Sequence, residues 1–256
     1  MNSYLSCYHE HLSLSQGALQ SAAGSIDKHI DFLYDVAMLH VVILISGRGS
    51  NMRSLVERAR HYRVVAVVSN KAEAPGLVFA RERGIETVVV PREHYASLTA
   101  QKEALLSAVK TFHPSLVALA GYMQIIAPNF IAAFSQRIVN IHPSLLPKYP
   151  GLDTHARAIA GGESEHGCTV HLVDEGVDTG IMLAQAPCAC SSRDTVPELS
   201  DRVLEREHVL YPWVLNNIAS GDITIGTGIV RYSESAQREA AAKGFRLNMS
   251  KDGEAL

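Results

Sequence analysis

Two polar side chains, Asn140 and His142, close the segment Arg137–His142, which contains three β-branched aliphatic residues. Such residues are typical of a strand, and Pro143 ends it because proline cannot donate to a strand ladder. Strand side chains alternate between two faces, so Asn140 and His142 project from the same face. An amide can donate to a carbonyl oxygen that becomes negatively charged, and an imidazole can give or take a proton. The pair therefore predicts chemistry at a carbonyl group, with a hydrogen-bonded turn as the alternative.

A glycine turn occurs earlier in the chain. Leu39–Ile45 is a nearly continuous apolar run, typical of a parallel strand that is buried on both faces. The turn Ser46–Asn51 follows, and from Met52 onward the apolar residues recur with helical spacing. Backbone N–H groups at a helix N-terminus bind anions, and glycine lets a phosphate approach closely. The turn matches neither a Walker loop nor the dinucleotide fingerprint, so it predicts either a phosphate site or an ordinary turn.

A longer segment carries a family resemblance. Asn140–Gly151, together with Thr154 and His155, resembles the signature of the phosphoribosylglycinamide (GAR) formyltransferases, which use 10-formyltetrahydrofolate in purine synthesis. The resemblance extends from about Met38 to about Tyr211 and so covers most of the chain. It implies transfer of the formyl group of 10-formyltetrahydrofolate to the amine of GAR, by a protein with a Rossmann-like formyltransferase fold.

The resemblance implies that Asn140, His142 and Asp178 are catalytic. Asn140 and His142 would hydrogen-bond the oxyanion of a tetrahedral intermediate, and Asp178 would orient or charge-pair with His142. Asp178 belongs to the acidic, glycine-containing loop Asp174–Gly180, whose composition alone is typical of a solvated turn. His171 matches a family histidine near the site, and we expect it to make a structural hydrogen bond there.

Substrate-binding residues are also implied by the resemblance. The residues that match the GAR site are Gly49, Ser50 and Asn51, at the ribose phosphate, and Glu207. The residues that match the folate site are Tyr122, Met123, Gln124, Ile125, Ile126 and Asn140. Backbone groups and apolar side chains line that folate pocket, with core packing as the alternative role of the two isoleucines.

Three positions depart from the family pattern. Other members often have Arg where this chain has Gln124, and a second Arg near Leu98 and Thr99. Contacts to the glutamate tail of the folate are therefore an open question for this chain. Some relatives have Lys three residues before Glu207, whereas this chain has Leu204, so no basic partner comes from that position.

Apolar strands alternate with helices along most of the chain. The strands are expected at Leu39–Ile45, Val64–Ser69, Thr87–Val90, Leu116–Ala120 and Arg137–His142, with helices at Gly76–Arg83 and Ser97–Thr111. The alternation predicts an α/β fold with a doubly wound, mostly parallel sheet in a single domain, whose ligands lie beyond the carboxyl ends of the strands. A further helix begins at the capping box Thr195–Glu198 and is expected to kink or end at Pro212.

The chain is expected to have three parts. Residues 1–37 are a poorly ordered N-terminal extension, residues 38–232 the formyltransferase domain, and residues 233–256 a flexible C-terminal tail. Met38 resembles the usual start of the family. Tyr8–His11, a His-rich run in the extension, is interpreted as part of a polar tail and not as a metal site.

Composition narrows the functional classes. A chain of 256 residues that is 47% hydrophobic can bury a sizeable core. Its formal net charge of −3 provides no broad basic surface for nucleic acid. The four cysteines have no metal-binding spacing, so a reduced, cytoplasmic protein without a metal is expected. No run approaches the roughly 18 apolar residues that span a bilayer. We therefore expect small-molecule substrates, no membrane partner, and a monomer or homodimer.

Other functions fit part of the pattern. Formyltetrahydrofolate deformylases share the Asn-x-His and Asp residues and pass the formyl group to water. They usually have an extra N-terminal regulatory domain, and a second His where this chain has Pro143. Methionyl-tRNA formyltransferases add a C-terminal tRNA-binding domain for which there is no room. A catalytically inactive nucleotide-binding module that uses Gly47–Asn51 would not require Asn140, His142 and Asp178.

Overall fold

The computed structural model of the protein describes residues 38–226 and 228–249. Its strands are β1 Leu39–Ile45, β2 Tyr62–Ser69, β3 Glu86–Val89, β4 Leu116–Leu119, β5 Ile138–His142, β6 Glu165–Leu172, β7 Met182–Ala189, β8 Ile223–Ile225, β9 Val230–Tyr232 and β10 Arg246–Leu247. Its helices are α2 Ser50–Glu57, α3 Pro75–Glu82, α4 Leu98–Lys110, α5 Pro128–Ala133, α6 Thr154–Ala160, α7 Val196–Ser220 and α8 Glu234–Lys243, with a 3₁₀ turn at Arg92–His94. The expected N-terminal extension, including its His-rich run, lies outside the described residues.

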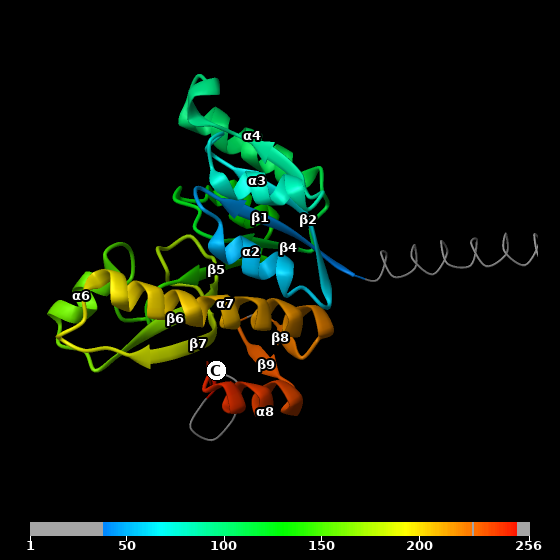
Figure 1. The fold of residues 1–256 in the computed structure, drawn as a ribbon. Coiled ribbons are helices and arrows are strands. Elements are labelled where there is room, and N and C mark those ends of the chain that lie inside the picture. Colours follow the sequence, from blue (N-terminus) through cyan, green and yellow to red (C-terminus); the bar gives the residue numbers. More distant parts are fainter. Residues whose placement is uncertain (1–37, 227, 250–256) are drawn as a thin grey trace, which may run out of the picture. The chain divides into compact units, whose positions relative to one another are not determined.

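The main sheet of the described residues has the order β10-β7-β6-β5-β4-β1-β2-β3 (Figure 1). The neighbouring strands β5, β4, β1, β2 and β3 pair in parallel, whereas β6, β7 and β10 pair antiparallel. Strands β8 and β9 form a separate hairpin. The prediction of a mostly parallel α/β sheet is confirmed, with an antiparallel extension beyond β5.

Helices cover both faces of the parallel part. In β1, Val41, Ile43 and Ile45 belong to one hydrophobic cluster together with residues of α2, α3 and α7. Val42 and Leu44 belong to a second cluster together with residues of α4 and α5. Because strand side chains alternate, a continuous apolar run fills both clusters at once. This arrangement is the doubly wound sheet that the sequence predicts.

Strands β1 and β4 lie side by side, although β2 and β3 come between them in the chain. The loops after them therefore meet, and the N–H of Ser46 donates to the carbonyl oxygen of Gly121 at 3.1 Å. Ligands of doubly wound sheets bind beyond the carboxyl ends of the strands at such a switch point. Strand β5, which ends with Asn140 and His142, pairs with β4, so the fold brings three polar loops to one edge of the sheet.

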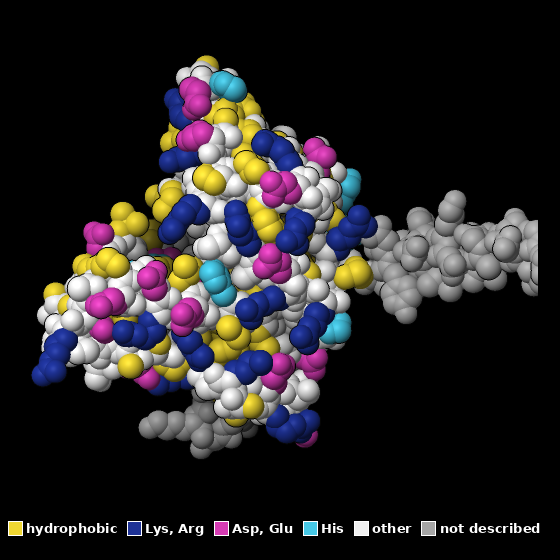
Figure 2. Space-filling view, viewed as in Figure 1, with side chains coloured by type: hydrophobic (Ala, Val, Ile, Leu, Met, Phe, Trp, Pro, Cys, Tyr) yellow, Lys and Arg dark blue, Asp and Glu magenta, His cyan; other side chains and the backbone are white. Residues whose placement is uncertain are grey.

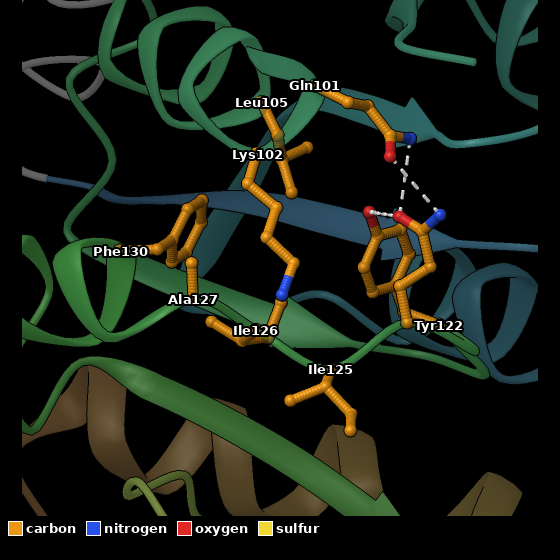
Figure 3. A pocket seen from close by; sticks show the side chains of 9 residues that line it. Gln101, Lys102, Leu105, Tyr122, Ile125, Ile126, Ala127 and Phe130 are labelled. Carbon is orange, nitrogen blue, oxygen red and sulfur yellow. Dashed lines mark hydrogen bonds between the residues drawn. The ribbon is translucent and has the colours of Figure 1, made fainter. Parts of the chain in front are cut away.

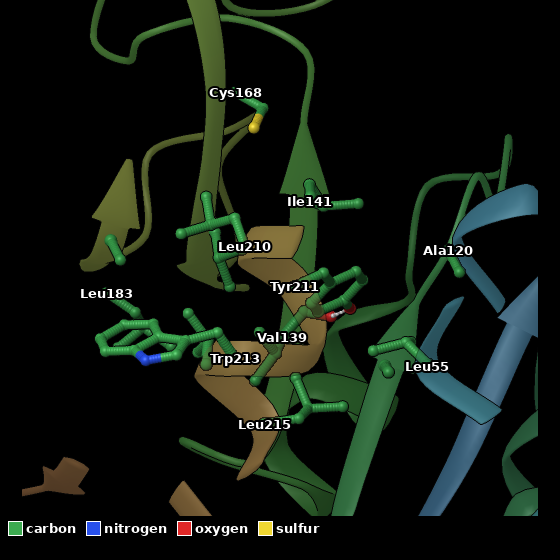
Figure 4. Packing of buried hydrophobic residues seen from close by; sticks show 14 of the residues in the cluster. Leu55, Ala120, Val139, Ile141, Cys168, Leu183, Leu210, Tyr211, Trp213 and Leu215 are labelled. Atoms are coloured by element: carbon green, nitrogen blue, oxygen red, sulfur yellow. Dashed lines mark hydrogen bonds between the residues drawn. The ribbon is translucent and has the colours of Figure 1, made fainter. Parts of the chain in front are cut away.

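Helix α7 packs across the sheet and contacts both β4 and β5. Figure 4 shows Tyr211 and Leu215 of α7 beside Val139 of β5. The buried hydroxyl of Tyr211 lies 3.1 Å from the carbonyl oxygen of Leu119 and 2.9 Å from that of Val139, and shares its proton between them. The helix thus fixes the relative position of the two strands that lead into the site.

The sequence predicts that the helix kinks or ends at Pro212; it does not end there, because α7 continues through Pro212 to Ser220. Proline in a helix interior costs about 3 kcal/mol. That cost is offset by burial, since Pro212 and the neighbouring residues Leu210–Leu215 are all buried. Asn216 also donates to the carbonyl oxygen of Pro212 at 2.8 Å.

The expectation of a flexible tail from residue 233 is corrected for its described part. Ser233 caps α8 by accepting from the N–H of Ala236 at 3.1 Å, and β10 extends the main sheet next to β7. The ring of Phe245, between them, packs edge-on against Trp213 of α7 at 5.3 Å. Tertiary packing against α7 therefore orders a segment whose sequence is polar and alanine-rich. Residues 250–256 lie outside the described residues.

The surface carries charges of both signs. On the face drawn in Figure 2, Lys and Arg side chains are interspersed with Asp and Glu. No helix among the described residues is long and apolar enough to cross a membrane.

Candidate active site

The side chain of His142 lies between two hydrogen-bond acceptors. Its Nε2 is 3.0 Å from the carbonyl oxygen of Tyr149, and its Nδ1 is 3.3 Å from Oδ2 of Asp178. A carbonyl oxygen only accepts, so Nε2 carries a proton. The imidazole is buried, with a relative exposure of 6% for the residue. The structure therefore brings together His142 and Asp178, as the sequence comparison with the family implies.

Asn140 is oriented by His171 on the neighbouring strand β6. Nδ1 of His171 donates to the carbonyl oxygen of Leu172 at 2.8 Å, which leaves Nε2 without a proton. That nitrogen accepts from Nδ2 of Asn140 at 3.2 Å. Burial lowers the pKa of His171, and the Asp178 carboxylate opposes this only in part, which favours the neutral ring. One amide hydrogen of Asn140 is thus fixed, and the other is free to donate to a ligand.

The loop after β6 presents Asp178 to both histidines. Asp174 holds the turn, because its Oδ1 accepts from the N–H of Gly176 at 3.1 Å and from the hydroxyl of Thr179 at 2.8 Å. A Cβ at Gly180 would overlap the carbonyl oxygen of Leu172, so only glycine fits there. Oδ2 of Asp178 accepts from the N–H of Gly151 at 2.8 Å.

The glycine turn after β1 leads into an open helix N-terminus. Gly49 has a φ of +72°, and a Cβ there would lie 3.1 Å from Cα of Gly76. The first backbone hydrogen bond of α2 runs from Arg53 to Gly49, so the N–H groups of Ser50, Asn51 and Met52 have no acceptor within the helix. The first turn carries no acidic residue. These N–H groups suit an anion.

Asn51 and Glu207 are in contact, although they come from α2 and α7. Nδ2 of Asn51 donates to Oε2 of Glu207 at 2.6 Å. Burial raises the pKa of the Glu207 carboxyl to about 7, and the hydrogen bond from Asn51 opposes this increase. Oδ1 of Asn51 is buried without a partner in the described residues. A buried amide oxygen without a donor suits a ligand hydroxyl.

The segment after β4 is held from both sides. The N–H of Met123 donates to Oγ of Ser46 at 2.8 Å. Oε1 of Gln124 accepts from the hydroxyl of Tyr122 at 3.0 Å and from Nε2 of Gln101 at 3.3 Å. Figure 3 shows the side chains of Gln101 and Tyr122 lining the same small pocket, which Leu105 and Phe130 close from the other side.

Two apolar side chains of this segment face outward. Met123 is 70% exposed and Ile125 is 75% exposed, whereas Ile126 is buried. Core packing, the alternative considered for both isoleucines, is therefore correct for Ile126 and wrong for Ile125. Leu152 follows Gly151, and Val177 precedes Asp178. The side chains of both are also exposed, by 78% and 59%. Exposed aliphatic side chains on the loops around a polar centre are typical of a ligand site.

Sequence reasoning missed the contacts that the loop after β5 makes with backbone atoms. The carbonyl oxygen of Tyr149 and the N–H of Gly151 contact His142 and Asp178. The available signal was the Pro-Gly pair at residues 150 and 151, which marks a turn. No group of three or more His, Cys, Asp or Glu that could hold a metal occurs in the described part of the chain.

The protein has an α/β fold with an Asn-His-Asp group at the carboxyl edge of a doubly wound sheet, an arrangement that suits chemistry at a carbonyl group. Residues 39–215 match the model of a family described as formyl transferase. The chain belongs to the formyl transferase family.

Named relatives and a solved structure show which members of this family the chain resembles. The phosphoribosylglycinamide formyltransferase of Escherichia coli strain K12 is 38% identical over 187 residues, which are 72% of this chain and 88% of that protein. The trifunctional purine biosynthetic protein adenosine-3 of Drosophila melanogaster is 40% identical over 191 residues, 72% of this chain but 14% of that protein. The crystal structure of phosphoribosylglycinamide formyltransferase from Brucella melitensis superposes with a TM-score of 0.69 at 46% identity, covering 74% of this chain and 100% of that one.

Proposed function

We propose that the protein is a phosphoribosylglycinamide formyltransferase, which transfers the formyl group of 10-formyltetrahydrofolate to the amine of GAR in purine biosynthesis. The observation that carries the proposal is the contact of 3.3 Å between Nδ1 of His142 and Oδ2 of Asp178, beside Asn140. This group can bind an oxyanion and move a proton, which are the two tasks of formyl transfer to an amine.

The reaction exchanges the formyl group of N10 for a proton of the amine, so a C–N and an N–H bond form while a C–N and an N–H bond break. The amine nitrogen of GAR attacks the formyl carbon, and the carbonyl oxygen becomes an oxyanion. The free amide hydrogen of Asn140 donates to that oxygen. His142 also donates once the substrate replaces one of its two present acceptors. The bond from the formyl carbon to N10 then breaks, and the proton lost by the amine replaces the formyl group on N10.

Asp178 guides this proton. Its Oδ2 is occupied by His142 and by the N–H of Gly151. Its Oδ1 lies 3.7 Å from Nε2 of His171. This distance is too long for a hydrogen bond, and that nitrogen carries no proton. Oδ1 is therefore available to accept from the attacking amine, directly or through water.

The GAR phosphate is assigned to the open N-terminus of α2. Gly49, Ser50 and Asn51 supply the backbone N–H groups and the close approach that a phosphate needs. Glu207 and the amide oxygen of Asn51 then lie where hydroxyl groups of the same nucleotide would meet them. The contact of 2.6 Å between the two side chains supports a shared role.

The folate is assigned to the segment after β4 and to Asn140. Tyr122, Met123, Gln124, Ile125 and Ile126 provide backbone polar groups and apolar surface. The outward-facing side chains of Met123 and Ile125, with Leu152 and Val177 beside Asp178, fit a flat ring that needs apolar contacts. The substrates are thus small molecules, and no step of this mechanism requires a metal. We further propose a cytoplasmic protein that is a monomer or homodimer, without nucleic acid or membrane partners.

The test is the absorbance change that accompanies loss of the formyl group from 10-formyltetrahydrofolate, recorded with and without GAR. A signal that requires GAR, with formylated GAR accumulating, supports the transferase. An equal signal without GAR, with release of formate, identifies a formyltetrahydrofolate deformylase. Phosphate binding without turnover in either assay identifies a nucleotide-binding module instead.

A further inference from the structure

The backbone of residues Lys148–Leu152 contacts both acid–base residues of the site. The carbonyl oxygen of Tyr149 accepts from Nε2 of His142 at 3.0 Å. The N–H of Gly151 donates to Oδ2 of Asp178 at 2.8 Å. Any shift of this loop would therefore move the acceptor of one residue and the donor of the other, although none of its side chains takes part in the proton transfer described above.

Glu163, just after α6, holds the first half of this loop. Its carboxylate accepts from Nζ of Lys148 at 2.9 and 2.8 Å, and from the hydroxyl of Tyr149 at 2.8 Å. The Lys148 side chain is 62% exposed, so its ion pair with Glu163 contributes little to holding the loop. The bond to Tyr149 is more sheltered, since the Glu163 side chain is 22% exposed. Glu163 thus acts mainly through Tyr149.

Arg157 of α6 holds the second half. Its Nη1 donates to the carbonyl oxygen of Pro150 at 2.7 Å and to that of Leu152 at 3.2 Å. Its guanidinium group also lies over the ring of Tyr149, 5.2 Å from the centroid. Each residue of the loop except Gly151 therefore contacts Arg157 or Glu163, and Gly151 contacts Asp178.

The backbone of the loop needs such support. Tyr149 has a φ of +56°, which is uncommon for a residue with a side chain, and Gly151 has a φ of +77°. A residue keeps such a conformation only where its surroundings determine it. The contacts of Glu163 and Arg157 supply that determination from outside the site.

We propose that Glu163 and Arg157 are positioning residues, which fix the backbone of residues 149–151 so that it holds His142 and Asp178 in their reactive geometry. This inference rests on the proposed function, because it gives these two side chains a role in that same site. Errors of about 1 Å in such geometry cost up to about 100-fold in rate.

The experiment compares Glu163→Ala with Glu165→Ala. Glu165 is a matched control, because it is the same residue type two positions further along the chain. Its carboxylate makes an ion pair of 2.8 Å with Arg246 instead of with a residue of the loop. We expect Glu163→Ala to lower kcat about 10-fold with both KM values unchanged, and Glu165→Ala to leave kcat as it is. Glu163→Gln should restore most of the rate, because its amide oxygen can still accept from Tyr149.

A spectroscopic readout separates this role from general stability. The Nε2 proton of His142, held by the Tyr149 carbonyl, should give a protected imidazole N–H resonance in the wild type and in Glu165→Ala, and should lose it in Glu163→Ala. If Glu163→Ala fails to fold, Tyr149→Phe removes the same hydroxyl bond. A wild-type rate and resonance in these variants, or an equal loss in the control, would overturn the proposal. The resonance tests it even in a protein that transfers no formyl group.

Discussion

Asn140 has a single described side-chain partner, His171, and this makes its role testable at the residue scale. Asn140→Ala removes the amide donor from the oxyanion. Loss of one such donor lowers kcat by about 10²–10³-fold, whereas the half-buried position should tolerate the smaller side chain. We expect a normal thermal unfolding curve and a strongly reduced rate in the GAR-dependent absorbance assay. Near-normal turnover in a folded variant would remove Asn140 from the mechanism.

Glu207 should make stability depend on pH. Its raised pKa of about 7 means that, from about pH 4.5 upward, the folded protein keeps a proton that the unfolded chain has released. Stability is therefore lost as the pH rises through this window. Glu207→Gln removes the dependence, so the variant should exceed the wild type by about 3 kcal/mol in unfolding free energy at pH 8 and match it at pH 4. Urea unfolding at both pH values checks this; a difference that is the same at both would contradict it.

Lys102 offers an answer to the missing arginines of the folate site. Among the described residues that line the pocket shown in Figure 3, which include Gln124, Lys102 is the charged one. It lies one helical turn from Leu98. Figure 3 shows its side chain running toward Ile126. Nε2 of Gln124 donates to Oε1 of Gln101 at 3.4 Å, so one of its two amide hydrogens is already used and a carboxylate could bind only the other.

Lys102→Gln should therefore weaken binding of folic acid by up to about fivefold, the upper limit for an exposed ion pair. Pteroic acid, which has no glutamate tail, should bind both proteins equally. Calorimetric titration measures both ligands, with Lys110→Gln at the far end of α4 as a control. Equal weakening for both ligands would show that Lys102 supports the pocket and not the tail.

At the scale of the element, the unit from β1 to α2 depends on Gly49. Alanine in its left-handed conformation costs about 1–2 kcal/mol, and its Cβ would also lie 2.9 Å from Cε of Met52 and 3.1 Å from Cα of Gly76. Gly84 provides the control, since it has a similar φ of +67° with nothing within 4 Å of a Cβ.

Gly49→Ala should thus destabilise the protein more than Gly84→Ala in urea unfolding, and it alone should raise the KM for GAR. The KM for the folate should not change, because the folate segment follows β4. Equal destabilisation with an unchanged KM for GAR would argue against a phosphate site at α2.

The same elements explain which parts of the fold the sequence predicts. Short apolar runs rich in β-branched residues, such as Leu39–Ile45, favour strands buried on both faces, and the predicted ends of the strands agree with the structure within a few residues. Helix α7 passes through Pro212 because burial of its neighbours outweighs a local rule. Helix α8 has a Ser cap and ends at Gly244, but its order depends on packing against a distant helix, which no local pattern reveals.

The candidate site divides in a similar way. The shared face of Asn140 and His142 follows from strand geometry, and family resemblance supplied Asp178, which has no local signal of its own. The contacts of Tyr149 and Gly151 could not be predicted, because they use backbone atoms that every residue type shares. Their positions depend on the turn, which Glu163 and Arg157 stabilise from another part of the chain.

At the scale of the whole molecule, the C-terminal segment is expected to contribute stability and not chemistry. Its helix α8 packs against β9 and β10, and Phe245 covers Trp213. Nη2 of Arg206 also donates to the carbonyl oxygen of Lys243 at 3.1 Å. The hydrogen bonds of Asn140 and His142 described above involve none of these residues.

Deleting residues 233–256 should therefore lower the melting temperature while turnover at low temperature persists. Burial of a phenylalanine side chain contributes about 1.5–3 kcal/mol, and a domain of this size loses about 2–4 °C per kcal/mol. With the sheet edge at β7 exposed as well, we expect a decrease of at least about 5 °C in calorimetry. A truncated protein that melts normally but has lost its activity would place the segment in the site instead.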